Sequence, residues 1–244
     1  MPLHHHALSR FFFLPFLLII CLIGCEQTPE EPPIDNPTPP PTTEGLTYLA
    51  LGDSYTIGES VATSDRWPAQ LVDTLTRARV DIEAFRIIAR TGWTTDELTT
   101  ALVDSMPIGT FDMVSLLIGV NNQFRGYPFA QYEQEFIALV DSAVKYAGGD
   151  TSKVFVVSIP DYGVTPFGQT RDADKIAQEL DQYNAYAQQV CEARSIPFFN
   201  ITPISREALN DPTLVAADGL HPSGEMYQQW VELMVADVQK LIED

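Results

Sequence analysis

The stretch LTYLALGDSY at residues 46–55 begins as an apolar run and breaks at Gly52 into a polar turn. An apolar run with little polar alternation is typical of a strand whose two faces are both covered by helices. Four further runs of this kind follow, at residues 82–89, 112–119, 153–159 and 197–202. Helices are expected in the longer stretches at residues 67–79, 95–105, 129–146 and 172–194, and from residue 223 to the end. This alternation predicts a three-layer α/β domain with a parallel sheet between helices.

Turns rich in glycine and polar residues lie at the carboxyl ends of the predicted strands. They read GDSY at residues 52–55, TGW at 91–93, GVNN at 119–122 and PDYG at 160–163, with DGLHP at 218–222 before the last helix. Each one alone is an ordinary turn or helix cap. Ligands of such sheets bind beyond the carboxyl ends of the strands, so the occurrence of all five segments at one edge predicts a functional site there.

A single histidine is available to this site. Three of the four histidines stand at positions 4–6, in a leader segment, which leaves His221 as the only imidazole of the domain. It follows Asp218 by three residues across a turn that contains glycine, so the carboxylate can reach one ring nitrogen and leave the other free as a base. A serine needs such a base to become a nucleophile. A zinc site of three histidines is excluded by the count, and we expect no metal and no cofactor.

Four of these segments, GDSY, Gly92, GVNN and DGLHP, resemble in this order the conserved blocks of the GDSL or SGNH hydrolase family. The resemblance covers nearly the whole domain. It implies a flavodoxin-like sheet of five parallel strands in the order 2-1-3-4-5 and an open active site. It also implies a serine esterase that works through an acyl-enzyme, with Ser54 as nucleophile and Asp218 and His221 completing a triad. The implied oxyanion donors are the backbone N–H groups of Ser54 and Gly92 and the side-chain amide of Asn121.

One position departs from the family pattern, because Asn122 stands where Gly-x-Asn-Asp has an aspartate. The G-x-S-x-G elbow of ordinary α/β-hydrolases is absent around Ser54. We assign Asp53 to the organisation of the turn before the nucleophile. Loop residues that could border the substrate are Arg125, Tyr127, Asp161 and Tyr162, and Arg125 is expected to be a solvated loop residue. Cys191 is expected to be a small buried residue on a helix.

The N-terminus differs in composition from the rest. Residues 11–24 form an uncharged apolar run that is too short to span a membrane but suits a secretory signal. It ends at Cys25 in a sequence that resembles the lipobox of bacterial lipoproteins. We therefore expect residues 1–24 to be a lipoprotein signal peptide, Cys25 to carry lipid, residues 25–44 to form a proline-rich spacer, and residues 45–244 to form the hydrolase domain. Such a protein would be exported to the bacterial cell envelope and anchored to a membrane.

The charge balance limits the partners. With 14 basic and 33 acidic residues, the net charge is -19, which opposes binding to nucleic acid. We expect a small-molecule, glycan or lipid ester as substrate. Two classes stay open, a lipid or lysophospholipid ester and an O-acetyl group on a glycan. An alternative of another class is a surface-displayed binding lipoprotein without activity, but the five predicted site residues are all present.

Overall fold

The computed structural model describes residues 45–105 and 109–243. The predicted signal peptide at residues 1–24, and Cys25 with the spacer at residues 25–44, lie outside these ranges. No helix in the described part of the chain is long and apolar enough to cross a membrane.

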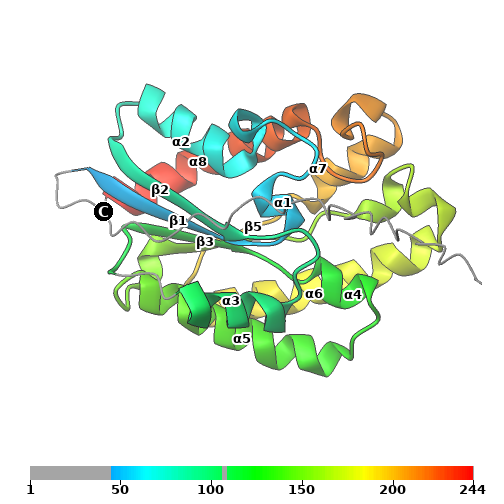
Figure 1. Ribbon diagram of the computed structural model, residues 1–244, viewed down its shortest axis with the longest axis horizontal. Helices are drawn as coiled ribbons and strands as arrows, with labels where there is room; N and C mark the ends of the chain where they lie inside the picture. The colour runs from blue at the N-terminus through cyan, green and yellow to red at the C-terminus, as the bar shows by residue number, and fades with distance from the viewer. Residues whose placement is uncertain (1–44, 106–108, 244) are drawn as a thin grey trace, which may run out of the picture. The chain divides into compact units, whose positions relative to one another are not determined.

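Five parallel strands form one sheet in the order β2-β1-β3-β4-β5, which confirms the predicted topology. The strands are β1 (Leu46–Gly52), β2 (Ile82–Ala89), β3 (Met113–Leu117), β4 (Val154–Val157) and β5 (Phe198–Phe199). Helices α2 (Trp67–Arg77) and α8 (Gly224–Glu243) cover one face, and α3 (Thr95–Ser105), α5 (Phe129–Tyr146) and α6 (Ala173–Glu192) cover the other (Figure 1). The predicted three layers are therefore present.

The shorter elements lie in the connections. They are the helices α1 (Ser54–Ile57), α4 (Val120–Phe124) and α7 (Thr202–Arg206) and, among the 3-10 turns, η3 (Tyr162–Val164) and η4 (Gly168–Thr170). The sequence did not predict α1, α4 or α7, because helices of four or five residues are too short to show a helical period. Two of them, α1 and α4, directly follow the carboxyl ends of β1 and β3.

Strands β3, β4 and β5 are shorter than predicted, and β5 shows the cause. Beyond Phe199, the backbone N–H of Ile201 donates to the Ser158 hydroxyl at 2.9 Å instead of joining the sheet. The Asn184 amide, from α6, accepts from the N–H of Ile159 at 2.8 Å in the same way. Polar side chains thus form the hydrogen bonds of the backbone where the strands end. The apolar sequence pattern continues past the last residue that is paired in the sheet.

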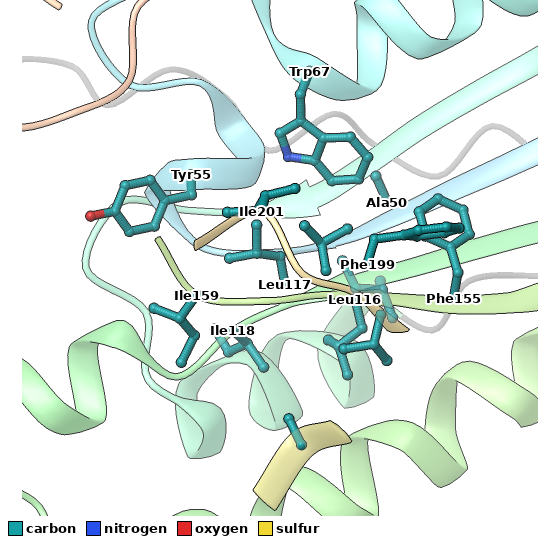
Figure 2. Packing of buried hydrophobic residues seen from close by; sticks show 14 of the residues in the cluster. Ala50, Tyr55, Trp67, Leu116, Leu117, Ile118, Phe155, Ile159, Phe199 and Ile201 are labelled. Carbon is teal, nitrogen blue, oxygen red and sulfur yellow. The ribbon is translucent and has the colours of Figure 1, made fainter. Parts of the chain in front are cut away.

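The core lies on both sides of the sheet. Trp67 begins α2, is fully buried, and points onto the sheet, where its ring lies 6.4 Å from that of Phe155 (Figure 2). Cys191 on α6 is also fully buried and unpaired, and burial raises the pKa of its thiol to about 12. The expectation that Cys191 is a small packed residue is confirmed.

Candidate active site

Ser54 stands on a tight turn between β1 and α1. Ser54 is 5% exposed and is the first residue of α1. The Asp53 carboxylate caps the helix, because its Oδ1 accepts from the N–H of Tyr55 at 3.0 Å. Gly52 is required just before, since a Cβ at this position would lie 2.5 Å from the carbonyl oxygen of Leu117 on β3. The local sequence therefore presents Ser54 at the carboxyl edge of the sheet.

His221 and Asp218 are joined directly. The imidazole Nδ1 lies 2.6 Å from Asp218 Oδ2. Asp218 Oδ1 accepts from the backbone N–H groups of Leu220 at 2.9 Å and His221 at 3.0 Å. The loop closes on itself where the N–H of Ala216 donates to the His221 carbonyl at 2.7 Å. His221 is 8% exposed, so the loop holds the ring and its carboxylate in one arrangement.

Ser60 is a member of this network that the sequence did not reveal. Its hydroxyl donates to Asp218 Oδ2 at 2.6 Å, and its backbone has a φ of 66°, a conformation that is uncommon for residues other than glycine. Partial burial acts to raise the pKa of Asp218, but hydrogen bonds from Ser60, the His221 ring and two backbone N–H groups outweigh it and lower the pKa. No sequence signal marks Ser60, since its partner lies 158 positions away.

Ser54 and His221 are brought to the same edge without being joined. The Tyr55 and His221 rings meet edge to face with centroids 5.6 Å apart, so the residue after Ser54 packs on the imidazole. The Ser54 hydroxyl makes no hydrogen bond to any residue that the structure describes. Hydrogen bonds between a nucleophile and its base are often long in the absence of ligand.

Asn121 is linked to the Gly92 turn through the backbone of Trp93. The Asn121 side-chain Nδ2 donates to the carbonyl of Trp93 at 2.9 Å, next to Gly92. Gly92 has a φ of +86°, which favours glycine. A carboxamide nitrogen has two N–H donors, so this bond leaves one N–H of Asn121 for another acceptor. The segments after β2 and β3 thus approach each other as the sequence predicted.

Arg125 is exposed just after α4, as expected for a loop residue, and its side chain is also held by two contacts. Its Nη2 donates to the carbonyl of Gly92 at 2.5 Å, and its Nη1 pairs with Glu97 at 3.3 Å. The Glu97 carboxylate in turn accepts from the N–H of Thr94 at 2.9 Å, which is one of the two hydrogen bonds of a capping box at the start of α3. The exposed Arg125 side chain therefore also links the turn after α4 to the Gly92 turn after β2.

The departure at Asn122 has a structural explanation. This side chain is fully buried, and its Oδ1 accepts from the N–H of Thr95 at 3.0 Å while its Nδ2 donates to the Thr95 hydroxyl at 2.6 Å. The Thr95 hydroxyl then donates to Glu135 on α5. An aspartate could not make the donation from Nδ2. The carboxamide therefore suits a chain of hydrogen bonds that ends on a carboxylate.

Asp53 is a buried carboxyl group directly before the nucleophile in sequence. It is fully buried, its Oδ2 has no partner among the described residues, and burial raises the pKa to about 7 against the hydrogen bond from Tyr55. Asp161, expected at the substrate border, lines a small hollow together with His221, and it also has a structural role because Arg206 binds its Oδ2 at 2.9 Å. Tyr162 is buried and its hydroxyl donates to Gln123 at 2.9 Å.

Tyr127, the fourth loop residue expected to border the substrate, is half-buried just after α4. Its N–H donates to the carbonyl of Asn122 at 2.9 Å. The backbone of Tyr127 therefore closes the turn that follows α4.

Comparisons with known proteins agree with this arrangement. Residues 50–229 match the GDSL-like lipase/acylhydrolase family. An arylesterase from Vibrio mimicus is 25% identical over 223 residues, which cover 91% of this chain and 94% of that protein. Two similar solved structures are a psychrotrophic esterase from Pseudoalteromonas sp., with a TM-score of 0.58 and 18% identity, and an acetylxylan esterase from Geobacillus stearothermophilus, with a TM-score of 0.60 and 20% identity.

Both structural matches span most of each chain. The first covers 82% of this chain and 100% of the Pseudoalteromonas chain, and the second covers 80% and 94%. The family match includes Ser54, Gly92, Asn121, Asp218 and His221, and it begins within β1 and contains the other four strands. The protein is a carboxylic ester hydrolase, and the chain belongs to the GDSL-like lipase/acylhydrolase family.

Proposed function

We propose that the protein hydrolyses carboxylic esters through an acyl-enzyme on Ser54. In the first step His221 Nε2 takes the Ser54 proton, the hydroxyl oxygen attacks the ester carbonyl, and the alcohol leaves with that proton. In the second step His221 activates a water that releases the acid. The contact that carries the proposal is the 2.6 Å bond from His221 Nδ1 to Asp218, because it leaves Nε2 as the free base.

The negative charge of the tetrahedral intermediate would be stabilised by the N–H groups of Ser54 and Gly92 and by the Asn121 amide. The second N–H of Asn121 supports this role, since the first is bound to the Trp93 carbonyl. Loss of one such donor typically costs about 3 to 4 kcal/mol of transition-state stabilisation. We therefore expect Asn121→Ala to lower kcat by about 100- to 1000-fold with little change in KM.

The substrate proposed is an ester with a short acyl group. The hollow that His221 and Tyr55 border has a volume of about 10 Å³, which is space for about one water-sized group. The methyl group of an acetyl ester, such as an O-acetyl group of a glycan, has about this size. A series of 4-nitrophenyl esters from acetate to palmitate tests the choice. We expect kcat/KM to be highest for acetate, whereas activity that persists at palmitate would favour a lipid ester.

The non-catalytic alternative is tested by Ser54→Ala. A binding lipoprotein would release no acid from any ester, and its Ser54→Ala variant would behave like the parent. A structurally similar esterase from Pseudoalteromonas sp. is inhibited by monoethylphosphonate, so a phosphonate is also expected to inactivate this protein through Ser54.

We further propose that the protein is exported and anchored to a bacterial membrane through Cys25, as its sequence at residues 11–25 suggests. Fractionation of cells that produce the full chain or its Cys25→Ala variant tests this. The parent should sediment with membranes and the variant should not. Membrane association that is equal for the two chains would contradict the anchor.

A further inference from the structure

Two phenylalanines and an arginine form a group at the edge of the site, named here the aromatic–arginine stack (Phe124, Phe167 and Arg171). The ring centroids are 6.1 Å apart, and the Arg171 guanidinium carbon lies 4.2 Å from the centroid of Phe167 and 5.3 Å from that of Phe124. Cation–π attraction holds the guanidinium over the rings. Phe124 stays 47% exposed. A guanidinium held in this way keeps its N–H donors available at its edge.

The stack connects the two sides of the proposed active site. Phe124 is the last residue of α4, the helix that carries Asn121. On the other side, the N–H of Phe167 donates at 2.9 Å to the carbonyl of Gly219, which lies between Asp218 and His221. The stack therefore lies between the helix of the oxyanion residue and the loop of the triad, so a group bound there can belong to a ligand whose ester reaches Ser54.

Arg171 differs from the other charged side chains near the aromatic–arginine stack in its lack of a polar partner among the described residues. A hollow of about 390 Å³ is lined by Arg125, Arg171 and Lys175 and by Asp172 and Glu179. Arg125 is held by the contacts described above, Lys175 pairs with Glu179 at 3.6 Å, and the Asp172 carboxylate caps α6 at 3.1 Å. Arg171 has neither an ion pair nor a side-chain hydrogen bond to the described residues.

We propose that Arg171 binds a carboxylate on the alcohol portion of the ester substrate. This inference rests on the proposed function and adds the charge of the substrate to it. A planar guanidinium matches a carboxylate with two parallel hydrogen bonds. The net charge of -19 makes the surroundings unfavourable for anions, so the guanidinium of Arg171 on the aromatic–arginine stack offsets that repulsion for the group that it contacts.

Two pairs of small acetyl esters test the proposal. They are 3- and 4-acetoxybenzoate, each compared with its carboxamide, which has the same acyl group and nearly the same size without the charge. Each kcat/KM is divided by the rate of hydroxide hydrolysis of the same ester, to remove the difference between the leaving groups. For the parent protein, we expect at least one carboxylate to be preferred over its carboxamide by about fivefold, the scale of a partly exposed ion pair.

The variants are Arg171→Gln and, as a matched control, Arg77→Gln. Arg77 is an exposed arginine on α2 that pairs with Asp73, so its loss changes the net charge equally. We expect Arg171→Gln to bring the ratio of carboxylate to carboxamide to one or below, and Arg77→Gln to keep it at about five. A ratio that survives Arg171→Gln, or a parent ratio of one for both pairs, would overturn the proposal.

Failure of this inference is distinguishable from failure of the proposed function. The uncharged carboxamide esters test the function alone, since the parent should hydrolyse them and Ser54→Ala should not. If both carboxamides are hydrolysed without any preference for the carboxylates, the esterase proposal stands and the role of Arg171 is refuted. If the parent hydrolyses none of the four esters, both proposals fail.

Discussion

Replacing Asp53 with Asn should change how stability depends on pH. Burial raises the pKa of this carboxyl from 3.8 to about 7 in the folded protein. Because the folded pKa lies above the unfolded one, the folded protein is favoured at low pH, and this contribution is lost as pH rises through about 7. Each pH unit corresponds to about 1.4 kcal/mol. The parent should therefore lose at most about 3 kcal/mol between pH 5 and pH 7 from this one group.

In Asp53→Asn, the carboxamide oxygen can still accept from the Tyr55 N–H that Asp53 caps, but the side chain no longer titrates. We expect the free energy of unfolding of the variant, relative to the parent, to rise by up to about 3 kcal/mol from pH 5 to pH 8. Urea unfolding followed by tryptophan fluorescence measures it. Asp73→Asn, which removes an exposed carboxylate from α2, is the matched control.

This reasoning would be refuted if the free energy of unfolding depended on pH in the same way in the parent and in Asp53→Asn. That outcome would mean that Asp53 is ionised in the folded protein at pH 5, and that a partner for its Oδ2 outweighs its burial. A variant that unfolds at every pH would be uninformative alone, so Asp53→Glu serves as a second variant. It keeps an ionisable group at the same site and should keep the pH slope.

Two further predictions concern hydrogen bonds that the sequence did not reveal. Ser60→Ala and Ser60→Gly both remove a hydrogen-bond donor to Asp218, so the pKa of Asp218 should rise and the stability that this carboxylate contributes above pH 4 should be lost at a higher pH during acid unfolding. The Gly variant should be about 1 kcal/mol more stable than the Ala variant, because residue 60 has a positive φ. An acid unfolding transition that is unchanged in both variants would contradict this. Asn122→Asp should lower the free energy of unfolding by about 1 to 3 kcal/mol at pH 7, because the Thr95 hydroxyl no longer accepts a hydrogen bond from residue 122 and a second carboxylate is placed near Glu135. Thermal unfolding measures this loss, and equal stability of the variant and the parent at pH 7 would refute it.

Much of the fold is predictable because its determinants are local or periodic. The apolar runs of β1 and β2 begin and end where the sequence indicates, and α3 and α5 have the predicted bounds. The pair of Asp218 and His221 is predictable for the same reason, since three residues and a glycine turn bring them together.

The rest depends on contacts between distant residues. Ser60 meets Asp218 across 158 positions, and Arg125 reaches Gly92 across 33. Neither residue lies in a periodic pattern, and serine and arginine in loops are usually solvated. The ends of β4 and β5 were also missed, because polar side chains such as Ser158 take over the backbone hydrogen bonds there. Side-chain partners at strand ends have no period that a sequence pattern could show.

The central claim, that Ser54 is the nucleophile, is tested most directly by covalent labelling. The protein is incubated with a fluorophosphonate, digested, and examined by mass spectrometry, with hydrolysis of 4-nitrophenyl acetate measured in parallel. We predict one phosphonate on the peptide that contains Ser54, loss of activity in proportion to labelling, and neither labelling nor activity in Ser54→Ala. Labelling of another residue that accompanies the loss of activity, or full activity of Ser54→Ala, would contradict the assignment.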